Sequence, residues 1–297
     1  MNSLHKQLHQ EAGIQDRGSS ARHKGLREDP LFWATKLLPA PKARALHALH
    51  AFCREIEAVA TSDASAALKQ SLLSSWRGEI ALLYEGRPRH ALTRSLLEPV
   101  RFYGLKCDDF LSIIDGWEAD TRVDGRAPSL PELDFHCSRT AGAIGLLAVR
   151  ILGLETSAGE RIAVELGHAV RLTELLRDLR GNAHRNRIYL PRELLTAHGL
   201  PSNGARSLLA HPAMENACSD LAARAEAHYA AAAKAIMACR SPGIWFAGLI
   251  LASYHAILQE LRARGWKRLE RPVRLSAWRR AVLTLRYALA TAKSFGT

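Results

Sequence analysis

Apolar residues recur at steps of three and four along most of the chain, which is the pattern of amphipathic helices. The clearest run follows Pro39 and Pro41, and one face of it holds Leu46, Leu49, Cys53, Ile56 and Ala60. A second run begins near Ser62 or Asp63 and ends at Gly86, and shorter helices are expected over 91–103 and 108–119. Strand signals are nearly absent, so the pattern predicts an all-α fold.

Helix boundaries can be placed in the second half of the chain as well. Ser129 with Glu132, and Ser157 with Glu160, have the Ser-x-x-Glu spacing of a capping box. They predict helices that end at Gly153 and at Gly181. A short helix is expected from Pro191 to about His198, and longer ones over 212–239, over 242–264 and from Ser276 onward.

Composition indicates a soluble globular protein. Of the 297 residues, 47% are hydrophobic and 24% charged, enough for a sizeable core. The longest nearly apolar stretch, 243–254, is shorter than the roughly 20 residues that span a bilayer, so no crossing segment is expected. Five cysteines without a Cys-x-x-Cys pair indicate a reducing compartment. We expect a flexible tail over 1–28, which lacks the apolar core of a secretory signal, and one helical domain over 29–297.

Positive charge gathers near the C-terminus. The formal net charge is +12, and residues 261–297 hold ten Lys or Arg against Glu270 alone. Such a segment is either a solvated helix face or a surface for anionic lipid, an acidic substrate or nucleic acid. No recognised nucleic-acid motif accompanies the charge, which argues against that partner. We expect a cytoplasmic protein with peripheral contact to anionic membrane at its inner face.

Two helical segments combine opposite charges on one face. Arg54 and Glu57 are three residues apart, the spacing of an intrahelical ion pair. Arg171, Glu174 and Asp178 share a second stripe, which is typical of a solvent-facing surface. Each stripe therefore has both a structural and a functional interpretation.

The residues around the second stripe favour the functional interpretation. Arg177 lies beside it, and the basic and aromatic loop that follows, Arg185 to Pro191, suits the binding of an anion and carries Arg187 and Tyr189. Gly142 and Gly145 fall inside a predicted helix, where Gly costs about 1 kcal/mol relative to Ala. Their presence predicts close approach by a ligand or by a neighbouring helix.

In this order and spacing, these residues resemble the squalene and phytoene synthase family, most closely the presqualene diphosphate synthases of bacterial hopanoid pathways. The similarity runs from about Phe32 to Tyr287. The segments that carry it are Trp33 with 37–39, 51–54, 114–120, 139–145, 176–179, 187–195, 264–266 and 272–275.

The resemblance implies a single-domain isoprenoid synthase fold, with helices around a deep apolar cavity that holds two farnesyl diphosphates. It also implies two aspartate-rich motifs that bind Mg²⁺ on the diphosphates. Carboxylate-bound Mg²⁺ neutralises the charge that grows on the leaving diphosphate. A carbocation then joins the double bond of the second chain.

Both metal motifs depart from the family pattern. The first, Asp-Asp-x-x-Asp, reads Glu57-Ala58-Val59-Ala60-Thr61 here, and the second keeps Asp178 but has Gly181 and Asn182 in place of acids. Three other positions that carry Asn, Gln and Tyr in the family are Glu174, Arg171 and His50. The resemblance makes Glu57, Glu174 and Asp178 the candidate catalytic and metal ligands. The candidate substrate-binding residues are His50, Arg54, Arg171, Arg177, Arg187, Tyr189, Gly142 and Gly145.

Two hypotheses remain open about turnover. In the first, Glu174 and Asp178 replace the lost acids, Glu57 faces them, and the protein is a Mg²⁺-dependent farnesyl transferase. In the second, Arg171 neutralises Glu174 and catalysis is weak or lost, which leaves an isoprenoid-binding or assembly protein on the same fold. Arg171 could also supply part of the charge that the metal supplies in the family, since arginines stabilise transferring phosphates.

Overall fold

The computed structural model describes residues 30–122, 126–202, 204–267 and 273–294, and these residues form helices and connecting loops without a strand. The first half contains α3 (Pro30–Ala34), the 3₁₀ turn η1 (Thr35–Leu37), α4 (Ala40–Thr61), α5 (Ala66–Tyr84), α6 (Ala91–Tyr103), α7 (Cys107–Thr121) and α8 (Leu130–Cys137). The second contains the π segment η2 (Ser138–Gly142), α9 (Ala143–Leu152), α10 (Ser157–Arg177), α11 (Leu179–His184), α12 (Arg192–Ala197), α13 (Ala205–Leu209), α14 (Met214–Ala238), α15 (Ile244–Arg264) and α16 (Ala277–Ser294). The all-α prediction is confirmed.

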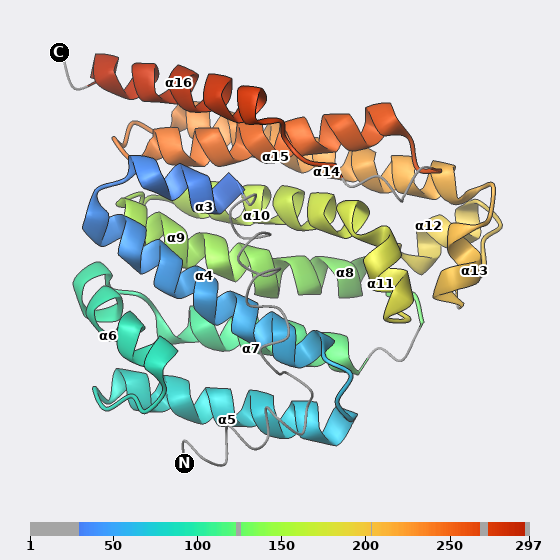
Figure 1. Cartoon of the computed structure of the whole chain (residues 1–297), viewed down its shortest axis with the longest axis horizontal. Helices are drawn as coiled ribbons and strands as arrows, with labels where there is room; N and C mark the ends of the chain where they lie inside the picture. The colour runs from blue at the N-terminus through green and yellow to red at the C-terminus, as the bar shows by residue number, and fades with distance from the viewer. Residues whose placement is uncertain (1–29, 123–125, 203, 268–272, 295–297) are drawn as a thin grey trace.

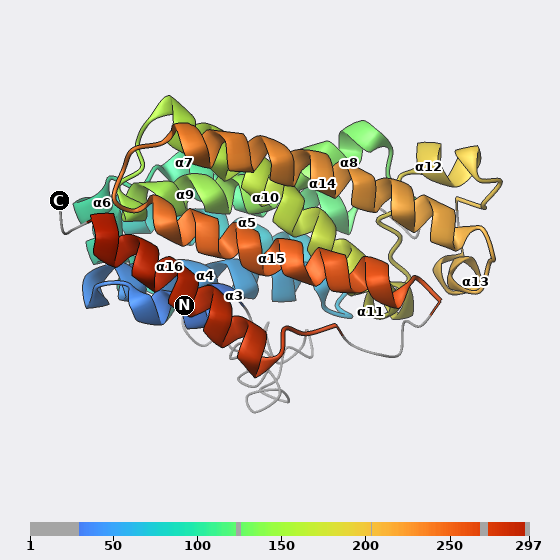
Figure 2. The ribbon, with the colours of Figure 1, turned by 90° about the horizontal axis from the view of Figure 1, so that it is seen from above.

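Helix α10 is the centre of the bundle. It packs against α14 and α15 on one side and against α9 and η2 on the other. Helices α7 and α4 pack against α9, and α5 packs against α7 at the far edge of the bundle (Figures 1 and 2). The flexible tail predicted for 1–28 lies outside the described residues.

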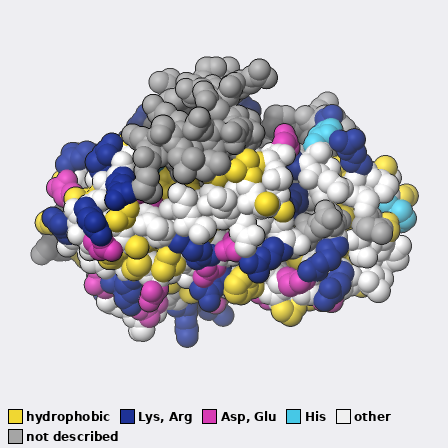
Figure 3. Space-filling view, turned by 90° about the horizontal axis from the view of Figure 1, so that it is seen from below, with side chains coloured by type: hydrophobic (Ala, Val, Ile, Leu, Met, Phe, Trp, Pro, Cys, Tyr) yellow, Lys and Arg dark blue, Asp and Glu magenta, His cyan; other side chains and the backbone are white. Residues whose placement is uncertain are grey.

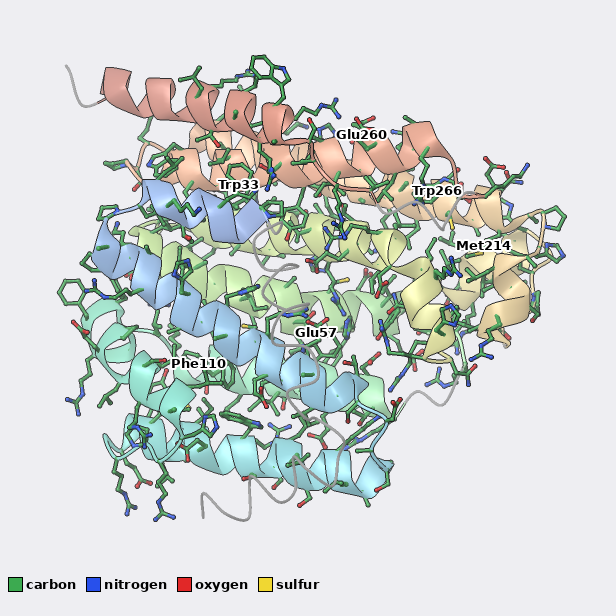
Figure 4. All side chains as sticks on the ribbon, in the orientation of Figure 1. Trp33, Glu57, Phe110, Met214, Glu260 and Trp266 are labelled. Atoms are coloured by element: carbon green, nitrogen blue, oxygen red, sulfur yellow. The ribbon has the colours of Figure 1, made fainter. Side chains whose placement is uncertain are left out.

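The apolar stripe of α4 explains how the lower layer holds together. Its predicted face is buried, and Phe52 makes edge-to-face contacts with Trp76 of α5 and Phe110 of α7 at centroid distances of 5.8 and 5.4 Å. Figure 4 labels Phe110 between α4 and α5. Such pairs add to the burial of the rings themselves, so α4 is fixed in rotation and its polar face is presented in a defined direction.

One of the two predicted capping boxes forms. The Ser129 hydroxyl accepts from the Glu132 N–H, and the Glu132 carboxylate accepts from the Ser129 N–H. The second is wrong by one residue, because the Thr156 side chain caps α10 by accepting from Gly159. Threonine is also an effective cap, so the start of the helix is placed nearly as expected.

The long helix predicted to end at Gly181 is broken at Asp178, whose φ of −104° and ψ of 29° are not helical. The chain then turns into α11, so that Asp178 sits at a corner rather than inside a helix. This corner determines which partners the carboxylate can reach.

Helix α15 is long and apolar enough to cross a membrane by composition alone. It contacts α10, α14 and α16, and 56% of its most apolar window is buried inside the protein. It therefore serves as a core helix of the bundle in this structure.

Candidate functional site

The site is centred on Arg171, which connects the two helices that carry the candidate acids. Its Nη1 lies 3.6 Å from Glu174 Oε2 on α10 and 3.9 Å from Glu57 Oε1 on α4. Figure 4 labels Glu57 on α4, near the middle of the bundle. The structure thus brings together Glu57 and Glu174 as the resemblance implied, with a guanidinium between them.

The surroundings of Arg171 hold its guanidinium in place. Its Nε and Nη2 donate to His136 Nε2 at 3.1 and 3.0 Å, and the group lies over the Trp117 ring at 4.7 Å. Arg171 is only 8% exposed. Burial tends to lower its pKa, but Glu57 and Glu174 outweigh this and raise it, so the side chain stays charged.

His136 is adapted to this role by its own environment. Burial, and then the charge of Arg171, lower its pKa to about 4, so the imidazole is neutral at pH 7. Because Nε2 accepts from Arg171, the ring proton is assigned to Nδ1, which faces the carbonyl oxygen of Gly116 at 3.4 Å. The neutral ring lets a cation be buried here without a second positive charge beside it.

Each of the two acids also has a second partner. Arg54 donates to Glu57 Oε2 at 2.5 Å, which confirms the i,i+3 pair suggested by the sequence. The Tyr254 hydroxyl of α15 donates to Glu174 Oε1 at 3.3 Å. Both carboxylates are therefore engaged on both oxygens.

Asp178 belongs to a different group. Its Oδ2 accepts from Arg185 at 2.8 Å, and Arg185 also donates to Asn182 Oδ1 at 2.8 Å. The carboxylate lies so close over Gly181 that a Cβ there would overlap it. A side chain at position 181 would therefore require Asp178 to move.

These contacts test whether the residues fit the metal cluster of the family. Octahedral Mg²⁺ needs carboxylate oxygens that are free to coordinate. Here Glu57, Glu174 and Asp178 are each paired with a guanidinium, and in the described part of the chain no three His, Cys, Asp or Glu side chains gather as a metal site. As they stand in this structure, the three carboxylates are paired with arginines and are not gathered as a preformed metal site.

Arg187 and Tyr189 meet at the end of α7. The Tyr189 hydroxyl donates to Asp120 Oδ2 at 2.9 Å, while Arg187 donates to the Asp120 carbonyl and lies 3.4 Å from Oδ2. Burial and the nearby carboxylate raise the pKa of Tyr189, so its phenol remains a donor. These contacts fix the loop after α11 against α7.

The other candidate positions have simpler surroundings. His50 is half-buried on α4 and Arg177 is exposed at the end of α10. A Cβ at Gly145 would lie 2.7 Å from the Ala163 carbonyl of α10, so a neighbouring helix explains this glycine, whereas a Cβ at Gly142 would make only an ordinary contact.

A basic pocket of about 500 Å³ opens beside these groups, where α4 ends, α5 begins and the loop after α11 passes the end of α7. Its lining consists of Thr61, Ser62, Asp63, Ala64, Ala66, Lys69, Thr121, Arg122, Arg185, Asn186 and Arg187. Burial, and then Arg187, lower the pKa of Lys69, and among the described residues the Lys69 ammonium makes no hydrogen bond or ion pair. The pocket offers cationic donors to an anion.

A mostly apolar pocket of about 420 Å³ adjoins the basic pocket and shares Arg122 and Arg187 with it. Its apolar wall includes Pro128, Leu133, Phe135 and Ile188. Side by side, the two pockets suit a ligand with an anionic head and an apolar chain.

Sequence reasoning missed several of these residues. The role of Lys69, and of His136 and Trp117 around Arg171, depends on packing between distant helices and leaves no local signal. Arg185 was part of the basic loop expected to bind an anion, but its pairing with Asp178, seven residues earlier, was not predicted.

Comparison with known proteins decides the family. The model of the squalene/phytoene synthase family matches residues 29–279. The chain belongs to this family. It is 38% identical over 271 residues to a presqualene diphosphate synthase of Rhodopseudomonas palustris, covering 91% of this chain and 96% of that protein. It is 35% identical over 270 residues to a presqualene diphosphate synthase of Zymomonas mobilis, with 90% and 92% covered.

The likeness extends to structure. A dehydrosqualene synthase in complex with a ligand superposes with a TM-score of 0.76 at 20% identity, covering 97% of this chain and 99% of that one. The isoprenoid synthase fold implied by the resemblance is confirmed. Enzymes of the family transfer prenyl groups in isoprenoid biosynthesis, generally with Mg²⁺, and act on isoprenoid diphosphates.

Proposed function

We propose that this chain binds an isoprenoid diphosphate such as farnesyl diphosphate, and that its ability to condense two of them into presqualene diphosphate is weak or lost. The observation that carries this proposal is Arg171, whose guanidinium lies between the acids that would otherwise hold metal. The class of ligand is proposed from the family and its relatives. Arg171 is the reason to propose that turnover is weak or lost.

The charges of the basic pocket and of the candidate metal ligands support binding without efficient turnover. A diphosphate head can be met by Lys69, Arg122 and Arg185 in the basic pocket, since arginine and lysine bind phosphate directly. Breaking the bond to the prenyl carbon needs charge that neutralises the leaving group as it forms. The acids that would hold metal for this step are already neutralised by Arg171 and Arg185.

Incubation with farnesyl diphosphate, with and without Mg²⁺, followed by product analysis tests the proposal. We expect binding but little release of diphosphate. Rapid formation of presqualene diphosphate that stops in Glu174→Asn would instead show a working metal site rebuilt on Glu57, Glu174 and Asp178. If the acids are only ion-pair partners, Glu174→Asn changes little.

A complementary variant restores the family's pattern with Ala58→Asp, Thr61→Asp, Asn182→Asp and Arg171→Gln together. We expect it to gain Mg²⁺-dependent diphosphate release, because it adds carboxylates and removes the competing guanidinium. The matched control is the same triple acid change with Arg171 kept, which should gain much less. A folded quadruple variant that still binds farnesyl diphosphate without release would place the defect outside the metal ligands.

We also propose that the protein acts in the cytoplasm against the inner face of the membrane. Farnesyl chains and the products made from them partition into lipid, and the C-terminal excess of Lys and Arg favours anionic lipid surfaces.

A further inference from the structure

Helix α16 exposes three large apolar side chains on one face. Trp278 is 77% exposed, Val282 44% and Leu285 60%. Their spacing of four and three places them in one stripe along the helix. Scattered single apolar side chains are normal on a surface, but a continuous stripe on a surface helix indicates a partner.

The opposite face of α16 is attached to the protein. Leu283 packs against the core, Leu275 is buried just before the helix, and α16 lies along the outer side of α15 (Figures 1 and 2). Arg279 also pairs with Glu260 of α15, which Figure 4 labels beside α16. The stripe of Trp278, Val282 and Leu285 is therefore held facing outward.

The charge on α16 is of one sign. Its sequence contains Arg279, Arg280, Arg286 and Lys293 and no Asp or Glu. On a wheel of 100° per residue, Arg279 and Arg286 fall along one border of the stripe. The side of the molecule seen in Figure 3 differs, because there Lys and Arg are interspersed with Asp and Glu.

We propose that α16 is the surface by which the protein docks on an anionic lipid bilayer. Trp278, Val282 and Leu285 enter the boundary between head groups and acyl chains, and Arg286, at the border of the stripe, faces the lipid phosphates. An apolar stripe bordered by cations is how helices lie in this interface, and tryptophan is favoured there because its ring is apolar and its N–H polar. This inference rests on the proposed function only in one respect, which is that a protein that binds a prenyl chain would meet its ligand at a lipid surface.

Sedimentation with vesicles tests the docking. We expect the full chain to bind phosphatidylglycerol–phosphatidylcholine vesicles at low salt and to bind pure phosphatidylcholine at least about tenfold more weakly, because each basic side chain near the surface contributes about fivefold. Trp278→Ser with Leu285→Ser should weaken binding to the anionic vesicles by about tenfold or more. Arg286→Gln should weaken it about fivefold.

Two substitutions elsewhere provide matched controls. Phe102→Ser removes an aromatic side chain that is 76% exposed on α6, and Arg87→Gln removes an exposed cation after α5. Neither should change vesicle binding. A loss in these controls equal to that in the α16 variants, or equal binding to neutral and anionic vesicles, would overturn the proposal.

Fluorescence gives a second readout. Anionic vesicles should shift tryptophan emission to the blue, and Trp278→Phe should remove most of that shift while its melting temperature stays unchanged. If the protein forms a dimer without vesicles and the Trp278→Ser, Leu285→Ser variant is monomeric, a second copy covers the stripe and lipid docking is wrong. No prenyl diphosphate is present in these experiments, so their outcome is independent of that of the proposed function.

Discussion

Two arginine–carboxylate groups lie where the resemblance places the candidate metal ligands, and they differ in burial. Arg171 is buried and has partners on α4, α8 and α10, whereas the Arg185 and Asp178 side chains are 39% and 55% exposed. Removing one partner of a buried pair leaves an uncompensated charge, while an exposed pair is screened by water. The first group should therefore be part of what holds the helices together, and the second a local feature of one corner.

The variant Arg171→Gln tests this difference between the two groups with the largest expected effect. It leaves Glu57 and Glu174 without their shared cation, and we expect a loss of about 3 kcal/mol in the free energy of unfolding. Chemical denaturation measures it. A loss below about 0.5 kcal/mol would mean that the acids are well hydrated and the arginine is dispensable.

Acid should destabilise the same buried group through His136. Its pKa is about 4 in the folded protein and ordinarily 6.5, so the unfolded chain binds the proton more readily between these values. Stability is present above pH 6.5 and is lost as the pH falls towards 4, by up to about 3 kcal/mol. His136→Asn, which keeps an acceptor for Arg171, should flatten this part of the pH profile measured by denaturation.

At the exposed corner we expect a much smaller effect. Arg185→Gln should lower the free energy of unfolding by less than about 1 kcal/mol. The same variant leaves Asp178 without its arginine, as Arg171→Gln does for Glu174. Comparing the two variants therefore separates the effect on the free energy of unfolding from any effect on Mg²⁺ binding. Equal losses in the two variants would show that burial does not distinguish the groups.

Mg²⁺ should have the smallest effect. Because the three acids are already paired, millimolar Mg²⁺ without ligand should leave the melting temperature unchanged, and calorimetry should detect no tight site. Tight binding to the empty protein would show that the ion displaces Arg171 or Arg185.

Much of the fold was predictable from the sequence because each helix carries its own signals. The stripe of α4 and the Ser129–Glu132 box are local patterns, and both form as expected. The break at Asp178 was missed, as were the short helices α3 and α13. A few residues carry too little periodicity to be distinguished from loops.

The sequence predicted which residues form the site better than it predicted how they contact one another. The pairing of Arg171 with Glu174 follows from their spacing, and the pairing of Arg54 with Glu57 does too. The contact of Arg171 with Glu57, the neutral His136 beneath it and the capture of Asp178 by Arg185 depend on how helices are positioned in space. The basic pocket likewise joins four segments that no local pattern relates.

The position of Arg171 also bears on the order of folding. Its partners Glu57, Trp117 and His136 lie far from it in the sequence, so its burial must await the docking of α4 and α7 onto α10. Such contacts close long loops, and the entropy cost of closing them is paid before the contacts stabilise the chain. Arg171→Gln should then speed unfolding and leave the folding rate nearly unchanged. We therefore expect Arg171 to act mainly on the barrier to unfolding of the finished bundle.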